Sequence, residues 1–343
     1  MNVLKRRGVS LTFLFLAVLV SGTVLKETVV PRLLRRRLTA AVHDNCKTCE
    51  LSLGRVDVSL LPLALKGRHV FFTGGEMKAT LVKVKAEGVY IPFSFFPLLK
   101  GHVRTGLITI ERPEVSVIEG DQYAASSTEA AGTQPLDLEI EGVEMKNAAF
   151  TYARNYPGRT ASFGISRLNA AVGTAGSSAR LRGADVEAGA DGLLEGSGRF
   201  RLHVRAKLFP KAPDVDVNLR IAGQDLAKMN RFFEVNDGVD LHGLLIDGLA
   251  SVAIRGAGLT SAAYVRYSGL GVKFEKNKDR GSPSAFFQNL LASVMTGKQN
   301  VKGGKYDRRG AASLARKPKE TLVSFALRGM KEAAMKVASQ GGK

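Results

Sequence analysis

Apolar residues recur at every second position along most of this chain. The longest runs are residues 200–208 and 214–221, in which apolar side chains alternate with charged or polar ones. Successive side chains of a β-strand point to opposite faces, so this spacing predicts half-buried strands with one apolar face. Shorter runs of the same kind begin at Arg55, Val82, Ile108, Val115 and Leu136.

Short segments rich in Gly, Pro, Asn and Ser separate these runs, for example residues 155–158 and 173–178. Such short connections favour an antiparallel β-meander over parallel βαβ units. Only three helices are predicted after residue 50, over residues 224–234, 283–296 and 319–339, and the last two make the C-terminal segment amphipathic and helical.

A mainly β fold with so few helices must cover its apolar faces in another way. The faces can meet each other in a closed β-sandwich, or they can line a curved, groove-like sheet that holds an apolar ligand. The alternation of apolar residues fits both arrangements, so both remain open at this point.

An uncharged segment, residues 9–25, follows Lys5, Arg6 and Arg7. As a helix it would span about 26 Å, close to the ~30 Å hydrocarbon core of a bilayer. No A-x-A cleavage site is present, so an uncleaved N-terminal transmembrane anchor is favoured over a cleaved signal peptide. Basic residues flank the segment on both sides, and charge alone therefore leaves the topology open.

Composition divides the chain into six parts. They are a membrane anchor (1–27), a juxtamembrane helix with a C-x-x-C segment (28–50), an N-terminal β region (51–123), a small polar linker or loop (124–134), a main β region (135–282) and a basic, helical C-terminal segment (283–343). Within the last part, residues 297–319 are rich in Gly, Lys and Arg and are predicted to be mobile.

The formal net charge of +19 indicates an acidic partner such as anionic lipid or nucleic acid. Nucleic acid is the weaker candidate, because the chain has no Trp and no RNP, zinc-finger or helix-turn-helix pattern. Contact with a membrane surface and plain solvation explain the basic clusters equally well. The candidate membrane-surface residues are Arg35, Arg36, Arg37, Lys302, Lys305, Arg308 and Arg309.

The two cysteines, Cys46 and Cys49, form a single C-x-x-C without the following His of a c-type haem site. A small disulfide in an oxidising compartment is favoured over a redox pair or a zinc site completed by His43. No nucleophile elbow, zinc-protease motif or phosphate-binding loop is present, and the five histidines are scattered. The sequence therefore predicts a protein that is not an enzyme and that uses no metal or cofactor.

Two short segments carry a resemblance to a known family. Residues 108–117, ITIERPEVSV, resemble the repeated strand-Pro-strand element of AsmA-like bacterial envelope proteins. Residues 322–333, LVSFALRGMKEA, resemble the closing segment of smaller, single-anchor relatives in that family.

This resemblance implies a single inner-membrane anchor, a periplasmic β-groove similar to chorein-type lipid bridges, and a part in phospholipid movement or outer-membrane homeostasis. The chain is much shorter than the family members thought to bridge both membranes. About fifteen strands at ~4.8 Å spacing would extend only on the order of 70 Å. We therefore do not expect it to cross the periplasm alone.

The leading hypothesis is a membrane-anchored envelope protein that binds or transfers phospholipid, or anionic lipid, along an apolar β-sheet groove. The alternative is a scaffolding envelope protein with a closed sandwich, no lipid cargo and other envelope proteins as partners. In the first case the candidate groove residues are Phe200, Leu202, Val204, Leu208, Val215, Val217, Leu219 and Ile221.

Overall fold

The computed structural model describes residues 49–60, 62–76, 80–94, 102–119, 138–208, 212–274, 309–317 and 322–339, with single positions between 32 and 48 and at 97, 210 and 320. The strands are β1 (Glu50–Leu60), β2 (Leu63–Glu76), β3 (Thr80–Pro92), β4 (Val103–Glu111), β5 (Glu114–Glu119), β6 (Leu138–Tyr156), β7 (Arg159–Val172), β8 (Ala175–Gly176), β9 (Asp185–Leu194), β10 (Gly198–Lys207), β11 (Asp214–Asp225), β12 (Val239–Arg255), β13 (Gly258–Phe274) and β14 (Arg309–Ala315). The helices are the 3₁₀ turns η2 (Ala179–Leu181) and η3 (Leu226–Met229) and the α-helices α4 (Asn230–Asp237) and α6 (Leu322–Ser339).

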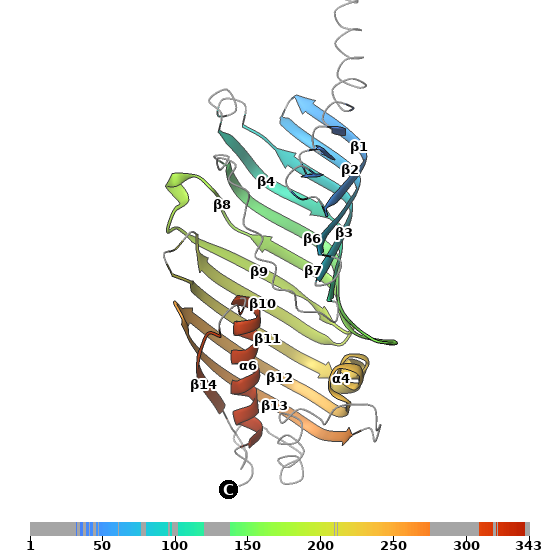
Figure 1. The fold of residues 1–343 in the computed structure, drawn as a ribbon, viewed down its shortest axis with the longest axis vertical. Coiled ribbons are helices and arrows are strands. Elements are labelled where there is room, and N and C mark those ends of the chain that lie inside the picture. Colours follow the sequence, from blue (N-terminus) through green and yellow to red (C-terminus); the bar gives the residue numbers. More distant parts are fainter. Residues whose placement is uncertain are drawn as a thin grey trace, which may run out of the picture.

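All these strands belong to one sheet with the order β1-β2-β3-β4-β6-β7-β9-β10-β11-β12-β13-β14. In Figure 1 the sheet runs from β1 at one end to β14 at the other, and α6 lies across the strands at the second end. The prediction of a mainly β, mostly antiparallel fold is confirmed. The described strands do not form two sheets packed face to face, so they do not have the closed-sandwich arrangement.

The one departure from antiparallel order involves β4 and β5. Both strands run parallel to β6 and antiparallel to β3, so they are two halves of one strand interrupted at Arg112 and Pro113. Arg112 has a φ of 44°, and Pro113, which has no N–H to contribute to a ladder, is fully buried. The strand-Pro-strand segment is therefore a single strand with an irregular break at Arg112 and Pro113, and its register with β3 and β6 is the same on both sides of the break.

This break belongs to a line of irregular residues that crosses the N-terminal half of the sheet. His69 in β2, Asn147 in β6 and Arg167 in β7 also have positive φ, between 50° and 51°. At His69 the two neighbouring pairs are interrupted without a change of register, whereas the register shifts between β6 and β7 beside Asn147 and between β7 and β9 beside Arg167. A bulge bends its strand and increases its twist, so the register shifts of β6 and β7 bend this part of the sheet.

Each irregular position also changes the phase of the alternation. In β1 the apolar residues are Leu51 and Leu53 before the irregular position and Val56 and Val58 after it. Gly54 and His69 stand opposite each other there in an unchanged register, so one irregular residue in each strand changes the phase of both strands together.

One face of the sheet is consequently apolar from the first strand to the last. Directly paired residues share a face, and they can be followed through the register across twelve strands. This apolar row consists of Val56, Gly67, Val89, Ile110, Met145, Ala170, Ala190, Leu202, Leu219, Ala250, Ala263 and Gly310.

Among the described elements, η3, α4 and α6 cover this face, mainly at β7 and from β11 to β14. The fully buried ring of Phe325 in α6 packs on Ile254 and Leu259, and Ala333 packs on Ala263 and Ala312. Of the predicted helices, residues 224–234 form η3 and α4, residues 319–339 contain α6, and residues 283–296 lie outside the described residues.

The prediction that residues 297–319 are mobile is wrong for residues 309–315, which form β14 at the edge of the sheet. Gly310, Ala312 and Leu314 alternate there, but two of the three are too small to stand out among the surrounding Arg, Lys and Gly residues. β14 is held by seven paired positions on β13 and by α6 lying over it.

We predict that Gly310→Ala lowers the free energy of unfolding by about 1–3 kcal/mol, the usual cost of overpacking. A Cβ atom at Gly310 would overlap the backbone carbonyl oxygen of Ala333, so α6 would have to move away from β14. The matched control is Gly258→Ala, where the nearest atom outside the adjoining residues, the Arg255 carbonyl oxygen, is 3.6 Å away. Denaturant unfolding compares the two, and an equal effect of both substitutions would contradict the close docking of α6.

Candidate functional site

The eight candidate groove residues come together on β10 and β11. Phe200 pairs with Ile221, Leu202 with Leu219, and Val204 with Val217, so these side chains share the apolar face. Val215 extends the same side of β11, and Leu208 directly follows the end of β10.

The structure divides six of these residues among three environments. Val215 and Val217 pack against the cluster of Val252, Ile254, Leu259, Phe325 and Ala326 beneath α6. Phe200 and Ile221 pack against a second cluster that includes Ile165 and Leu194. Leu202 and Leu219 lie between the two clusters, in the apolar row itself.

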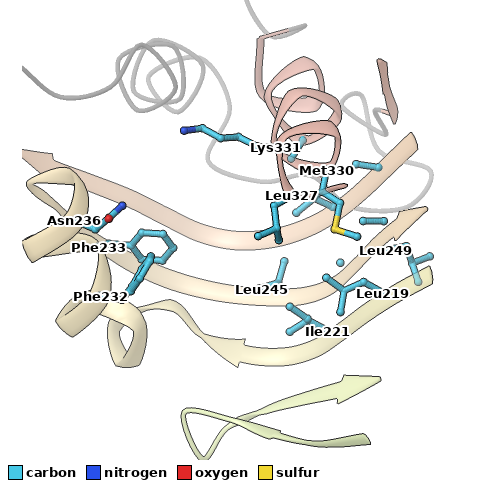
Figure 2. A pocket seen from close by; sticks show the side chains of 15 residues that line it. Leu219, Ile221, Phe232, Phe233, Asn236, Leu245, Leu249, Leu327, Met330 and Lys331 are labelled. Carbon is cyan, nitrogen blue, oxygen red and sulfur yellow. The ribbon is translucent and has the colours of Figure 1, made fainter. Parts of the chain in front are cut away.

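An apolar pocket of about 560 Å³ lies where the sheet, α4 and α6 meet. Figure 2 shows Leu219, Ile221 and Leu245 on the strands, with Leu327 and Met330 pointing toward them from α6. Phe232 and Phe233 of α4 line a second side, and the polar ends of Asn236 and Lys331 lie at the rim. Leu327 is 60% exposed, which is unusual for a large apolar side chain and leaves the pocket accessible.

Local hydrogen bonds fix α4 beside the pocket. The side chain of Asp225 accepts from the Ala227 amide and begins η3, while Gly238, in the left-handed conformation, ends α4. The buried Asn230 side chain accepts from the Leu241 amide at 2.8 Å and donates to the Leu241 carbonyl at 3.0 Å. These bonds tie the start of α4 to β12.

Aromatic stacking fixes the other side of α4. The Phe163 ring lies 5.3 Å from Tyr152 and 5.4 Å from Phe232, measured between centroids. The Tyr156 hydroxyl donates to Asn236 at 2.6 Å. The aromatic wall of the pocket is therefore held to β6 and β7 as well as to β12.

An ion pair holds α6 in place over the pocket. Arg328 donates from two nitrogens to the two carboxylate oxygens of Glu320, each at 2.8 Å, and also donates to the Ala315 carbonyl at the end of β14. The hydrogen bonds from Arg328, and next the one from the Lys317 amide, lower the pKa of Glu320 from 4.5 to about 2.

The candidate membrane-surface residues are only partly within the described residues. Arg35 and Arg36 are exposed and line a cavity of about 620 Å³ together with Arg32, His43 and Leu51 of β1. Arg309 lies at the opposite edge of the sheet, on β14. The other members, Arg37, Lys302, Lys305 and Arg308, lie outside the described residues, as does the uncharged segment 9–25.

Cys46 and Cys49 form a disulfide, and Cys49 is buried directly before β1. In the described part of the chain, no three His, Cys, Asp or Glu side chains are grouped as metal ligands. Within those same residues, no helix has the length and hydropathy needed to span a bilayer. Neither a family model nor a curated protein matches this chain.

Sequence reasoning missed the helical walls of the pocket. Phe232, Phe233 and Met330 stand at helical spacing, which equally predicts residues buried in a core. In the sequence, Leu327 could have indicated the pocket, because it stands close to Phe325 and Met330 but outside the narrow apolar stripe that these residues form on the predicted helix.

We predict that the ion pair of α6 contributes stability above pH 4.5 and that this contribution is lost as the pH falls toward 2. The sign follows from the lowered pKa of Glu320, because protonation in acid removes the charge that Arg328 binds. The unfolding free energies of the wild type and Glu320→Gln should differ at pH 7 and converge between about pH 4.5 and 2. The matched control is Glu114→Gln, an exposed carboxylate of β5, and a constant difference for Glu320→Gln across this pH range would contradict the prediction.

Proposed function

We propose that this chain is a membrane-anchored envelope protein that binds or transfers phospholipid, with the acyl chains lying on the apolar face of the sheet. The apolar row across twelve strands is the observation that carries this proposal. At ~4.8 Å per strand, the part from β1 to β10, which the described helices cover mainly at β7, is about 34 Å long. Contiguous apolar patches on soluble monomers are usually only a few hundred Å² in area, so a surface of this length favours a lipid ligand.

The bend of the sheet supports a groove. Irregular residues with positive φ at His69, Arg112, Asn147 and Arg167 follow one line across the strands, with register shifts at β6 and β7, while the apolar residues stay on one face. At the other end, Figure 2 shows β12 and β13 curving beneath α6, with the pocket on their concave side. We infer that acyl chains lie along this curved face and that one chain end reaches the pocket between α4 and α6, whose 560 Å³ is typical of ligand sites.

Basic residues at the first strand supply a site for the headgroup. Arg32, Arg35 and Arg36 line a cavity that also contains Leu51, an apolar-face residue of β1. Guanidinium groups bind phosphate through paired hydrogen bonds, so a lipid phosphate can bind there while its acyl chains enter the apolar face.

We place the protein in the inner membrane, with residues 9–25 as a single N-terminal anchor and the sheet in the periplasm. The resemblance of residues 108–117 and 322–333 to AsmA-like envelope proteins supports this location. The Cys46–Cys49 disulfide fits an oxidising compartment such as the periplasm.

We predict that the full chain, extracted in a mild detergent, carries bound phospholipid in native mass spectrometry. Leu202→Glu places a carboxylate in the middle of the apolar row and should lower lipid occupancy at least ~10-fold, because an unpaired buried charge is strongly unfavourable. His203→Glu is the matched control, since it adds the same group one residue away on the polar face.

Circular dichroism must show that both variants keep the fold. Equal lipid retention by both variants, or a stable wild type without lipid, would contradict the groove. The lipid-free result would instead favour a scaffolding function.

A further inference from the structure

Several basic residues on the polar face of the same sheet pair with acids on neighbouring strands. Arg205 pairs with Asp185, Lys207 lies 3.2 Å from Asp214, and Arg255 donates to Asp216 at 2.7 Å. Such cross-strand charge pairs stabilise a sheet.

One row of this face brings three arginines together. It consists, in register across five strands, of Arg201, Arg220, Leu249, Tyr264 and Arg309, and is called here the arginine row. Arg201 is directly opposite Arg220, and two like charges in this position destabilise a sheet. Within the described part of the chain Arg201 has no ion pair within 4 Å, although Asp191 is its neighbour on β9.

The partners of Arg220 do not neutralise this row. Its guanidinium lies 3.0 Å from the buried carboxylate of Asp247, which Arg266 also approaches at 3.1 Å. Two guanidinium groups thus share one carboxylate and keep one net positive charge. Arg220 is about half exposed and retains N–H groups that Asp247 does not use.

The arginine row lines a depression of about 470 Å³. Its remaining polar lining is His203, Asn218 and Ser251, and no carboxylate is part of it. The acids of neighbouring positions are Asp191, opposite Arg201 on β9, Asp247, which is engaged by the two arginines, and Glu187, which lies 3.9 Å from His203. The guanidinium of Arg309 lies 5.6 Å from the centre of the Tyr264 ring, where the aromatic face orients it beside the depression.

We propose that this depression binds a phosphate group, carried either by a soluble phosphate compound or by a lipid headgroup. Arginine forks match phosphate oxygens with two parallel hydrogen bonds, and the hydroxyl of Ser251 and the amide of Asn218 complete the donor set. The bound anion would also relieve the repulsion between Arg201 and Arg220. The site lies on the face opposite the apolar row, so it does not depend on lipid binding there.

The test is a calorimetric titration of the full chain in detergent with pyrophosphate at 0.15 M salt, which screens non-specific attraction to the basic protein. The double variant Arg201→Gln/Arg309→Gln should bind at least ~10-fold more weakly, as expected for lost hydrogen bonds between charged groups. The matched control is Arg159→Gln/Arg182→Gln, which removes the same charge at exposed positions outside the depression. This control should weaken binding less than about twofold.

A second measurement keeps the test decisive if the double variant is unstable. Arg201→Gln alone removes the like-charge pair, so without phosphate it should melt at or above the wild-type temperature. Pyrophosphate should raise the melting temperature of the wild type but leave that of Arg201→Gln nearly unchanged. Absence of wild-type binding, or equal weakening in the Arg159/Arg182 control, would overturn the proposal.

The source of the phosphate follows from a parallel titration with glycerophosphoglycerol, the soluble headgroup of an anionic phospholipid. Tighter binding of this diester assigns the site to a lipid headgroup, and tighter binding of pyrophosphate assigns it to a soluble phosphate compound. Either result supports a phosphate site when the double variant Arg201→Gln/Arg309→Gln abolishes the binding. Phosphate binding at this site does not depend on acyl-chain binding. Leu202→Glu should therefore leave both titrations unchanged.

Discussion

An apolar face on an open sheet must be covered, because water is an unfavourable neighbour for so much hydrocarbon surface. In this chain one face stays apolar across twelve paired strands, and the described helices cover it mainly at β7 and from β11 to β14. The pocket forms where α4 and α6 meet the sheet. The part that the described helices leave uncovered is the surface to which we propose that lipid binds.

Helix α6 packs tightly on the sheet. α6 approaches the sheet closely at Gly310 and Gly329, and the buried Ser261 hydroxyl donates to the Gly329 carbonyl at 2.8 Å. The Glu320–Arg328 pair then fixes the start of the helix to the end of β14. A helix held in this way closes the C-terminal end of the apolar face, so the proposed lipid binding leaves the side of β1 as the entry.

The alternation of apolar residues was enough to predict the mainly β fold, the shared face of β10 and β11, and the position of α6. Periodicity could not predict that all strands join one sheet, since a sandwich uses the same pattern. In the sequence, the line of irregular residues was visible only as changes in the phase of the alternation, for example between Leu53 and Val56. Such changes resemble ordinary strand ends. β14 was missed because Gly310 and Ala312 are small, and the pocket was missed because its helical side chains become neighbours of the strands only in the folded chain.

The most direct test of the central claim is photocrosslinking in cells that produce the full chain and are grown with labelled phosphate. A benzophenone amino acid at Val143 or Leu202 lies on the apolar face, and at Glu144 or His203 it lies one residue away on the polar face. The account predicts labelled phospholipid adducts at the first two positions and few at the second two. Adducts to protein alone at Val143 and Leu202, or equal lipid labelling of both faces, would contradict it.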